Sequence, residues 1–457
     1  MGTFAAVLYG IGQGNGAGPA FWLSHLVVMF CVLDTLSHGI QFRSPSGKTT
    51  HKSPGMGFVD DVTLGCTHSN PNKSNDMVEL KKDVGTEVLR QITNSAQHWE
   101  TMLYTDGGRL ELSKCYWIYV SWKWINGIAV LKAIQDSDLI MNLWQSEIKQ
   151  SVVITRKSIS DAPRVLGCHV AVDGKWKKEV GRWKLEAIRF ANKVKNAGFN
   201  RTCGAKIYPT IWLPKLRYIS PAVCFTKNES KEIDKPVVRH CLSSAGYSQR
   251  FPRRVVFGPT SKGGLEWESC YSLQVYEKIQ FCISHFRRQT KLGNLLKILV
   301  QSIQVSSGIQ DKILETQVKW IHWVEPTWVH FLQQALWDIE GEIKTEIKWY
   351  NPPRENDRFI MDIFYARGYS TNALKAINRC RIHLRVITIS DICTYDGQTI
   401  CHEIWNMIPP RESSWEWSLQ IMPAKKDRNI WFNAIRSLVN VDGKLSEPLG
   451  KWTEKTH

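Results

Sequence analysis

Two adjacent carboxylates, Asp60 and Asp61, interrupt the apolar segment MGFVDDVTLG at residues 56–65. The flanking runs are rich in β-prone residues, so the segment predicts a hairpin with the two acids at its bend. Adjacent acids in an apolar strand are costly to bury unless they are paired or bound to metal. The pattern is typical either of an Asp-rich turn or of a carboxylate pair that holds the divalent metals of phosphoryl transfer. Ordinary turns usually carry Gly or Asn, and neither residue separates these runs.

A glycine-rich segment, YGIGQGNGAGPAFW at residues 9–22, could bring its backbone close to a nucleotide. Residues 12–17 match G-x-G-x-x-A, and Asp34 follows where an acid would bind a ribose hydroxyl, which indicates a dinucleotide such as NAD. The segment from Ala17 to Val27 is short for the crossover helix, and no strand–helix rhythm follows it. The alternative is a loop that lines the template of a polymerase.

The chain of 457 residues carries a formal net charge of +17 and has a pI near 9.3, which favours a polyanionic partner. The densest basic stretch, residues 174–217, holds twelve Lys or Arg against two Glu. A helix is expected over 180–197, with Trp176, Trp183 and Trp212 interleaved among the basic residues. The alternative is a solvated helix face. The residues expected to follow a phosphate backbone are Lys175, Lys177, Arg182, Arg189 and Lys193.

The 12 cysteines include no C-x-x-C pair, which indicates reduced thiols and an intracellular protein, in the nucleus or the cytoplasm. A second cluster combines cysteine and histidine, but its spacings match no familiar zinc finger, so buried thiols are favoured over zinc. The longest apolar run, residues 21–36, is too short for a spanning helix, and no signal peptide is evident, so no membrane partner is expected. The residues of this second cluster are Cys380, His383, Cys393, Cys401 and His402.

Apolar periodicity and turn residues predict the remaining elements. Further helices are expected over 78–104 and 267–305. The other predicted elements are a turn at 105–108, a strand over 109–122, a turn and strand at 125–130, a hairpin over 164–176 with its turn at Asp173–Gly174, and a loop over 251–264.

Four segments resemble, in order, motifs B to E of the reverse transcriptases of eukaryotic non-LTR retrotransposons. GIGQGNGAGPAFW resembles motif B, and FVDD at Phe58–Asp61 is similar to the [YF]-x-D-D of motif C. GGRLELSKC resembles motif D, and VLG at 165–167 resembles the motif E hairpin. The resemblance covers roughly residues 8–175 and is plausible to about 310.

The resemblance implies an α+β fold: a partial right-hand polymerase palm (an antiparallel sheet with helices) over 1–175, a basic, helical, thumb-like region over 176–310, and a mixed C-terminal extension over 311–457. It implies RNA-directed DNA polymerisation, with Mg²⁺ or Mn²⁺ as cofactor and with an RNA template, a DNA primer and deoxynucleoside triphosphates as partners. The implied site residues are Asp60 and Asp61 as metal ligands, Lys114 as general acid, Gln13, Gly14 and Phe58 at the template and nascent base pair, and Leu166 and Gly167 in the primer grip.

One part of the family pattern has no counterpart. Motif A supplies a further metal-binding aspartate ahead of motif B, and here the chain starts about ten residues before that motif. We therefore expect an N-terminally truncated palm and thumb that is inactive as it stands, because positioning is most of phosphoryl-transfer catalysis. The alternatives are a non-catalytic nucleic-acid-binding protein derived from a retroelement and, less favoured, an NAD-binding oxidoreductase.

Overall fold

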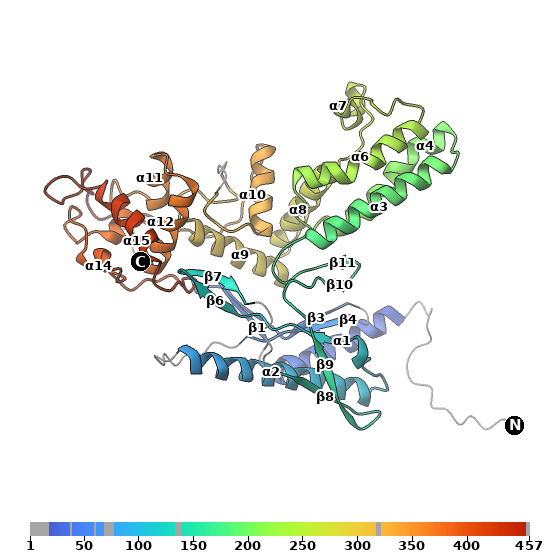
Figure 1. Ribbon diagram of the computed structural model, residues 1–457, viewed down its shortest axis with the longest axis horizontal. Coiled ribbons are helices and arrows are strands. Elements are labelled where there is room, and N and C mark those ends of the chain that lie inside the picture. The colour runs from blue at the N-terminus through green and yellow to red at the C-terminus, as the bar shows by residue number, and fades with distance from the viewer. Residues whose placement is uncertain are drawn as a thin grey trace. The chain divides into compact units, whose positions relative to one another are not determined.

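The computed structural model describes residues 18–36, 39–58, 61–67, 77–132, 139–316 and 321–453. The fold is mixed α+β, as expected, and its described strands form two- and three-stranded sheets (Figure 1). The chain divides into two compact units. The first comprises Met1–Arg43, Thr50–Trp122 and Leu131–Asp161, and the second comprises Ser44–Thr49, Lys123–Val130 and Ala162–His457.

In the first unit, two helices pack around a small apolar core and support short antiparallel hairpins. The predicted helix over 78–104 is confirmed as α2, Met77–Thr105. Leu26, Met29 and Leu33 of α1, Gly18–Leu36, are buried against Trp99 of α2. The four strands that belong with these helices are β1 Ile40–Arg43, β2 Thr50–Ser53, β3 Gly55–Phe58 and β4 Asp61–Leu64, paired β1–β2 and β3–β4.

The predicted strand over 109–122 is wrong for most of its length. Its first part forms a 3₁₀ turn, η1, at Leu112–Lys114, because Ser113 turns its hydroxyl back to the Glu111 carboxylate (2.6 Å) while Leu112 is buried. Only a short strand, β5 Tyr116–Trp117, follows, and it pairs in parallel with β9. The other strands of this region are β6 Trp122–Ile125, β7 Ile128–Leu131, β8 Met141–Gln145 and β9 Gln150–Arg156.

The predicted turn and strand at 125–130 is confirmed by the β6–β7 hairpin. Its connection, Asn126–Gly127, has positive φ at both residues (50° and 76°), as an Asn-Gly turn between twisted strands requires.

The main segment of the second unit, from Ala162 onward, starts with a short hairpin and a layer of helices around one apolar cluster. Helix α3, Lys177–Asn196, confirms the predicted helix, and its apolar face is buried along α6, which lies beside it (Figure 1). The elements here are β10 Arg164–Val165, β11 Cys168–His169, α3, α4 Arg201–Ile207, the π-helical turn η2 Tyr208–Trp212, α5 Leu213–Ile219, α6 Lys227–Ser244, α7 Arg253–Val256 and η3 Thr260–Lys262.

A further apolar cluster extends from Cys282 to Leu445. The single helix predicted over 267–305 is two helices, because the chain turns at Gln289 (φ 49°) and Thr290 caps a new helix at Gly293 N–H. Since α9 contributes Leu296 to this cluster, the C-terminal core begins before residue 311. Its helices are α8 Cys270–Arg287, α9 Lys291–Ser307, α10 Trp328–Asp338, α11 Ile360–Ala366, α12 Thr371–Leu384, α13 Ile389–Ile392, α14 His402–Trp405 and α15 Lys425–Arg436.

Within the part of the chain that the structure describes, no helix is both long enough and apolar enough to cross a bilayer.

Candidate nucleic-acid interface

The predicted acidic hairpin is present as the strand pair β3–β4. Phe58 lies opposite Asp61 in the antiparallel register, with two residues between them in the sequence. Val59 and Asp60 themselves lie outside the described residues, as does the side chain of Phe58. Asp61 is the first residue of β4 and is exposed, so its carboxylate faces solvent at the end of the hairpin.

Apolar packing positions this hairpin against α1. Val62 and Leu64 of β4 pack on the core that α1 and α2 form. On the opposite strand, a Cβ at Gly57 would lie 2.9 Å from Cε2 of Phe30, whose ring lies 5.3 Å from that of Trp99. The close approach leaves no room for a side chain at Gly57, so this glycine seats the hairpin on the helix.

The sequence did not single out Tyr116, which lies near Asp61, or Lys157, which lies over the Tyr116 ring. Burial, and secondarily the charge of Asp61, raise the pKa of Tyr116 in β5. The ammonium of Lys157 lies 3.7 Å from the centre of the Tyr116 ring, and its backbone N–H donates to Trp117 O (2.9 Å). The parallel β5–β9 pairing brings Lys157 here, and no local pattern indicates that pairing.

Lys114, the predicted general acid, is exposed at the end of η1. Its charge helps lower the pKa of Glu111, although the hydrogen bond from Ser113 lowers it more. Lys114 is thus displayed from a turn rather than from the strand that the sequence predicted.

The metal site stays a prediction. Among the described residues, no three His, Cys, Asp or Glu side chains gather where they could hold a metal ion. Asp61 supplies an exposed carboxylate of the kind that Mg²⁺ prefers. Asp60, Gln13 and Gly14 lie outside the described residues.

The hairpin predicted over 164–176 forms, but its turn lies at Leu166–Gly167 instead of Asp173–Gly174. Both turn residues have positive φ (47° and 83°), which matches the twist of the flanking strands. Asp173 makes a separate turn and accepts a hydrogen bond from Lys175 N (3.0 Å) ahead of α3. Leu166 is 38% exposed, and the Tyr218 hydroxyl of α5 donates to its carbonyl (2.9 Å).

A buried acid fastens this hairpin to the helices. Glu179 in the first turn of α3 accepts hydrogen bonds from His169 N (2.9 Å) and Trp183 Nε1 (2.7 Å) and forms an ion pair with Arg182. Burial opposes ionisation of Glu179, but these donors hold its pKa below the ordinary value. The β10–β11 hairpin and α3 are therefore joined by charge-assisted hydrogen bonds.

The predicted phosphate-binding residues fall into two groups. Lys177, Arg189 and Lys193 are exposed on α3. Lys175 pairs with Asp173 (3.0 Å), and Arg182 is held by Glu179.

Two of the three interleaved tryptophans, Trp183 and Trp212, do not form a stacking surface, and Trp176 is partly buried against the same core. Trp183 and Trp212 are 4% and 0% exposed and meet edge to face in the core, with ring centroids 5.8 Å apart. They are apolar core residues because they fall on the same face of their helices as the other buried side chains.

The cysteine–histidine cluster is built into the C-terminal core. Cys380, Cys393 and Cys401 are buried, free thiols. The two ring nitrogens of His383 lie within hydrogen-bond distance of the carbonyls of Gln420 (3.0 Å) and Met407 (3.2 Å). These contacts place His383 in a structural role.

Asp34 does not lie where the dinucleotide-binding fingerprint requires its acid. Asp34 lies in the last turn of α1, where the fingerprint needs the end of a β-strand. The carbonyl and carboxylate of Asp34 both face the ammonium of Lys52, at 3.0 and 3.8 Å. An acid in this helical position does not present the ribose-binding geometry.

Comparison with known protein families, with curated proteins and with solved structures finds no match for this chain.

Proposed function

We propose that the chain is a reverse-transcriptase-like, nucleic-acid-binding protein, whose acidic hairpin derives from an RNA-directed DNA polymerase. The observation that carries this proposal is the β3–β4 pair. Its register leaves two residues between Phe58 and Asp61, it follows a helix that begins at Gly18, and it precedes the long helix α2. The order agrees with the motifs that the sequence resembles.

In this proposal Asp60 and Asp61 would hold the divalent metal. When bound, such a metal neutralises the charge that develops on the transferred phosphoryl group. The residues of this chain position the metal ligand. Gly57 and Val62 hold the hairpin on α1 and so determine where the carboxylate of Asp61 points. Lys114, exposed in its turn, would protonate the leaving pyrophosphate.

The β10–β11 hairpin and α3 would hold the duplex. Leu166 presents an apolar side chain at a turn that Tyr218 and Glu179 immobilise. Lys177, Arg189 and Lys193 extend from α3 as exposed cationic side chains that suit a phosphate backbone. Binding of this kind releases counterions, so its affinity falls steeply as salt rises.

Primer–template binding by the full chain tests the proposal. We expect the affinity for an RNA–DNA duplex to fall with salt, and the slope to decrease by roughly one for each phosphate contact that a Lys193→Gln or Arg189→Gln substitution removes. Lys175→Gln is the matched control, because Lys175 pairs with Asp173. Binding that does not change with salt contradicts the proposal.

A non-catalytic nucleic-acid-binding protein is the second candidate, and the net charge of +17 favours it equally. Primer extension with Mg²⁺ or Mn²⁺ separates the two. Because the four shared motifs omit the motif A carboxylate, we expect duplex binding without robust incorporation. Incorporation that disappears in Asp60→Asn and Asp61→Asn would assign polymerase activity to this chain.

A further inference from the structure

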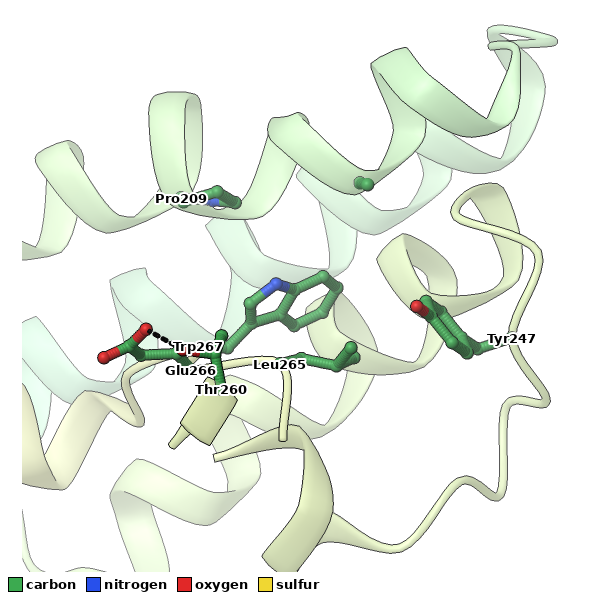
Figure 2. Close-up of a pocket in the computed structure, with 7 residues that line it drawn as sticks. Pro209, Tyr247, Thr260, Leu265, Glu266 and Trp267 are labelled. Carbon is green, nitrogen blue, oxygen red and sulfur yellow. Dashed lines mark hydrogen bonds between the residues drawn. The ribbon is translucent and has the colours of Figure 1, made fainter. Parts of the chain in front are cut away.

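A cleft of about 490 Å³ opens in the helical part of the second unit, and none of the site residues that the sequence predicted lines it. Figure 2 shows it between the helix that carries Pro209 and the loop that carries Thr260, Leu265 and Glu266. Tyr247 closes one end, and Trp267 stands in the middle. The volume lies within the range of small-molecule sites in proteins.

The aromatic residues of the cleft are held in place. Trp267 stacks on Tyr208 (centroids 4.6 Å apart, planes at 12°), and the Tyr208 hydroxyl donates to Glu268 O (2.7 Å). The Tyr247 ring lies 5.2 Å from that of Phe251, centroid to centroid, and the residue is 40% exposed. The cleft therefore offers an accessible aromatic ring, Tyr247, at its end, and a fixed Trp267 of which only 6% is exposed at its floor.

The loop that carries the polar groups is equally well defined. Backbone bonds run from Leu265 N to Val255 O (3.0 Å), from Glu266 N to Gly258 O (2.8 Å) and from Trp267 N to Val256 O (3.1 Å). They hold Glu266 at φ 51°, a left-handed conformation that non-glycine residues adopt at some cost.

The carboxylate of Glu266 is available to a ligand. It accepts a hydrogen bond from the Thr260 hydroxyl (3.1 Å, Figure 2), which leaves further acceptor capacity on its two oxygens. Glu266 is exposed.

The surroundings of the cleft are strongly basic. Residues 201–209 and 246–267, the segments that carry the lining residues, include six Lys or Arg, none of which lines the cleft itself, and a single acid, Glu266; a second acid, Glu268, follows directly. A cationic ligand would be repelled by this excess, although an aromatic pocket with one carboxylate could otherwise suit it. An anionic ligand with a planar aromatic group fits both the charge and the walls. The six basic residues are Arg201, Lys206, Arg250, Arg253, Arg254 and Lys262.

We propose that this cleft binds a nucleobase, with guanine preferred. The base would insert between Tyr247 and the Pro209 wall over Trp267, and its phosphate would remain among the basic residues outside. Glu266 selects guanine because an ionised carboxylate accepts only, and the Watson–Crick edge of guanine carries two adjacent donors, N1–H and N2–H. The base comes from a free nucleotide or from an unpaired nucleotide of a single strand.

Binding of GMP to the full chain, measured by equilibrium dialysis, tests the assignment. We expect GMP to bind more tightly than UMP and ribose 5-phosphate not to compete. Glu266→Gln should weaken GMP binding roughly tenfold, because one charge-assisted acceptor is lost. Ala205→Trp fills the cleft and should abolish binding, whereas Thr202→Trp, exposed on the same helix but outside the cleft, should bind like the wild type.

Three results would overturn the assignment: unchanged GMP binding in Ala205→Trp, equal binding of ribose 5-phosphate, or equal binding of UMP. A uridine decamer with one central guanosine, compared with the all-uridine decamer, identifies the source of the base. Preference for the guanosine strand over GMP indicates a single strand, and the reverse indicates a free nucleotide. Duplex binding by Ala205→Trp is measured alongside, and it reports on the proposed function independently of the cleft.

Discussion

The two hairpins at the centre of the proposed function are built in opposite ways. The β3–β4 hairpin displays its acid: Asp61 is exposed, and the strands are held by apolar contacts through Val62 and Gly57. The β10–β11 hairpin carries no acid at its turn and is held by a buried one, Glu179. An exposed carboxylate is free to bind a ligand, whereas a buried and fully paired one fixes position.

The largest expected effect on stability comes from removing Glu179, the buried acid that attaches the β10–β11 hairpin to α3. Glu179→Ala leaves the N–H groups of His169 and Trp183 and the charge of Arg182 without their acceptor. We expect a loss of about 3 kcal/mol in the free energy of unfolding of the second unit, measured by urea denaturation. Glu186→Ala is the control, because its partly exposed pair with Lys215 contributes little, below about 1 kcal/mol. An equal loss of unfolding free energy in both variants would show that Glu179 stabilises no more than an exposed ion pair does. The β10–β11 hairpin would then not be held by its buried acid.

A second buried acid in the helical region makes stability depend on pH. Burial raises the pKa of Asp234 from the ordinary value of an aspartate to about 7, and its carboxylate accepts a hydrogen bond from Cys270 N (2.9 Å). The folded state therefore keeps a proton that the unfolded state has released, so the stability from this group falls as pH rises from about 4 to 7.

Asp234→Asn should remove that fall, which is on the order of a few kcal/mol. The measurement is the urea midpoint of both proteins at pH 4.5 and 7.5. An equal change in wild type and variant would show that Asp234 does not titrate in this range.

The apolar packing of the β3–β4 hairpin on α1 can be disrupted by a substitution at Gly57. Gly57→Val places a branched side chain against the Phe30 ring, where even a Cβ would lie 2.9 Å away. We expect a loss of about 2 kcal/mol in the first unit, since overpacking forces a rigid neighbour to move. Gly181→Ala in α3 meets no atom within 4 Å and should instead stabilise by about 0.5–1 kcal/mol. Tolerance of valine at position 57 would mean that the hairpin is not seated on α1.

The smallest effect concerns a single hydrogen bond. Tyr218→Phe removes the donor to Leu166 O and leaves a carbonyl that water can reach. We expect a loss of about 1 kcal/mol or less in stability, together with weaker duplex binding if the Leu166 turn grips the primer. Tyr276→Phe, another exposed tyrosine, controls for the loss of a hydroxyl alone. Lower duplex affinity in both variants would argue against a specific role for the turn.

The features that the sequence predicted correctly are local. The spacing of apolar residues in α3 predicts which of its side chains are buried. The acid pair between two β-prone runs predicts the β3–β4 hairpin. The turn at Leu166–Gly167 was missed because a non-glycine residue at positive φ has no strong sequence signature, while Asp173–Gly174 does. Lys157 and Tyr116 were missed for another reason: they meet through a strand pairing across about forty residues, and periodicity carries no information on such pairing.

The cleft could not be predicted either, since its walls come from a helix and from a loop that is distant in sequence. Within that helix, α4 and α5 are joined through a π-helical turn at Tyr208–Trp212, which contains Pro209. Such a turn holds one residue more than an α-helical turn, so every side chain beyond it is rotated about the axis by about 100°. Deleting one residue from this turn would remove that rotation and swing Tyr218 away from the Leu166 carbonyl. The rotation of α5 after residue 212 thus decides whether Tyr218 can reach the β10–β11 hairpin.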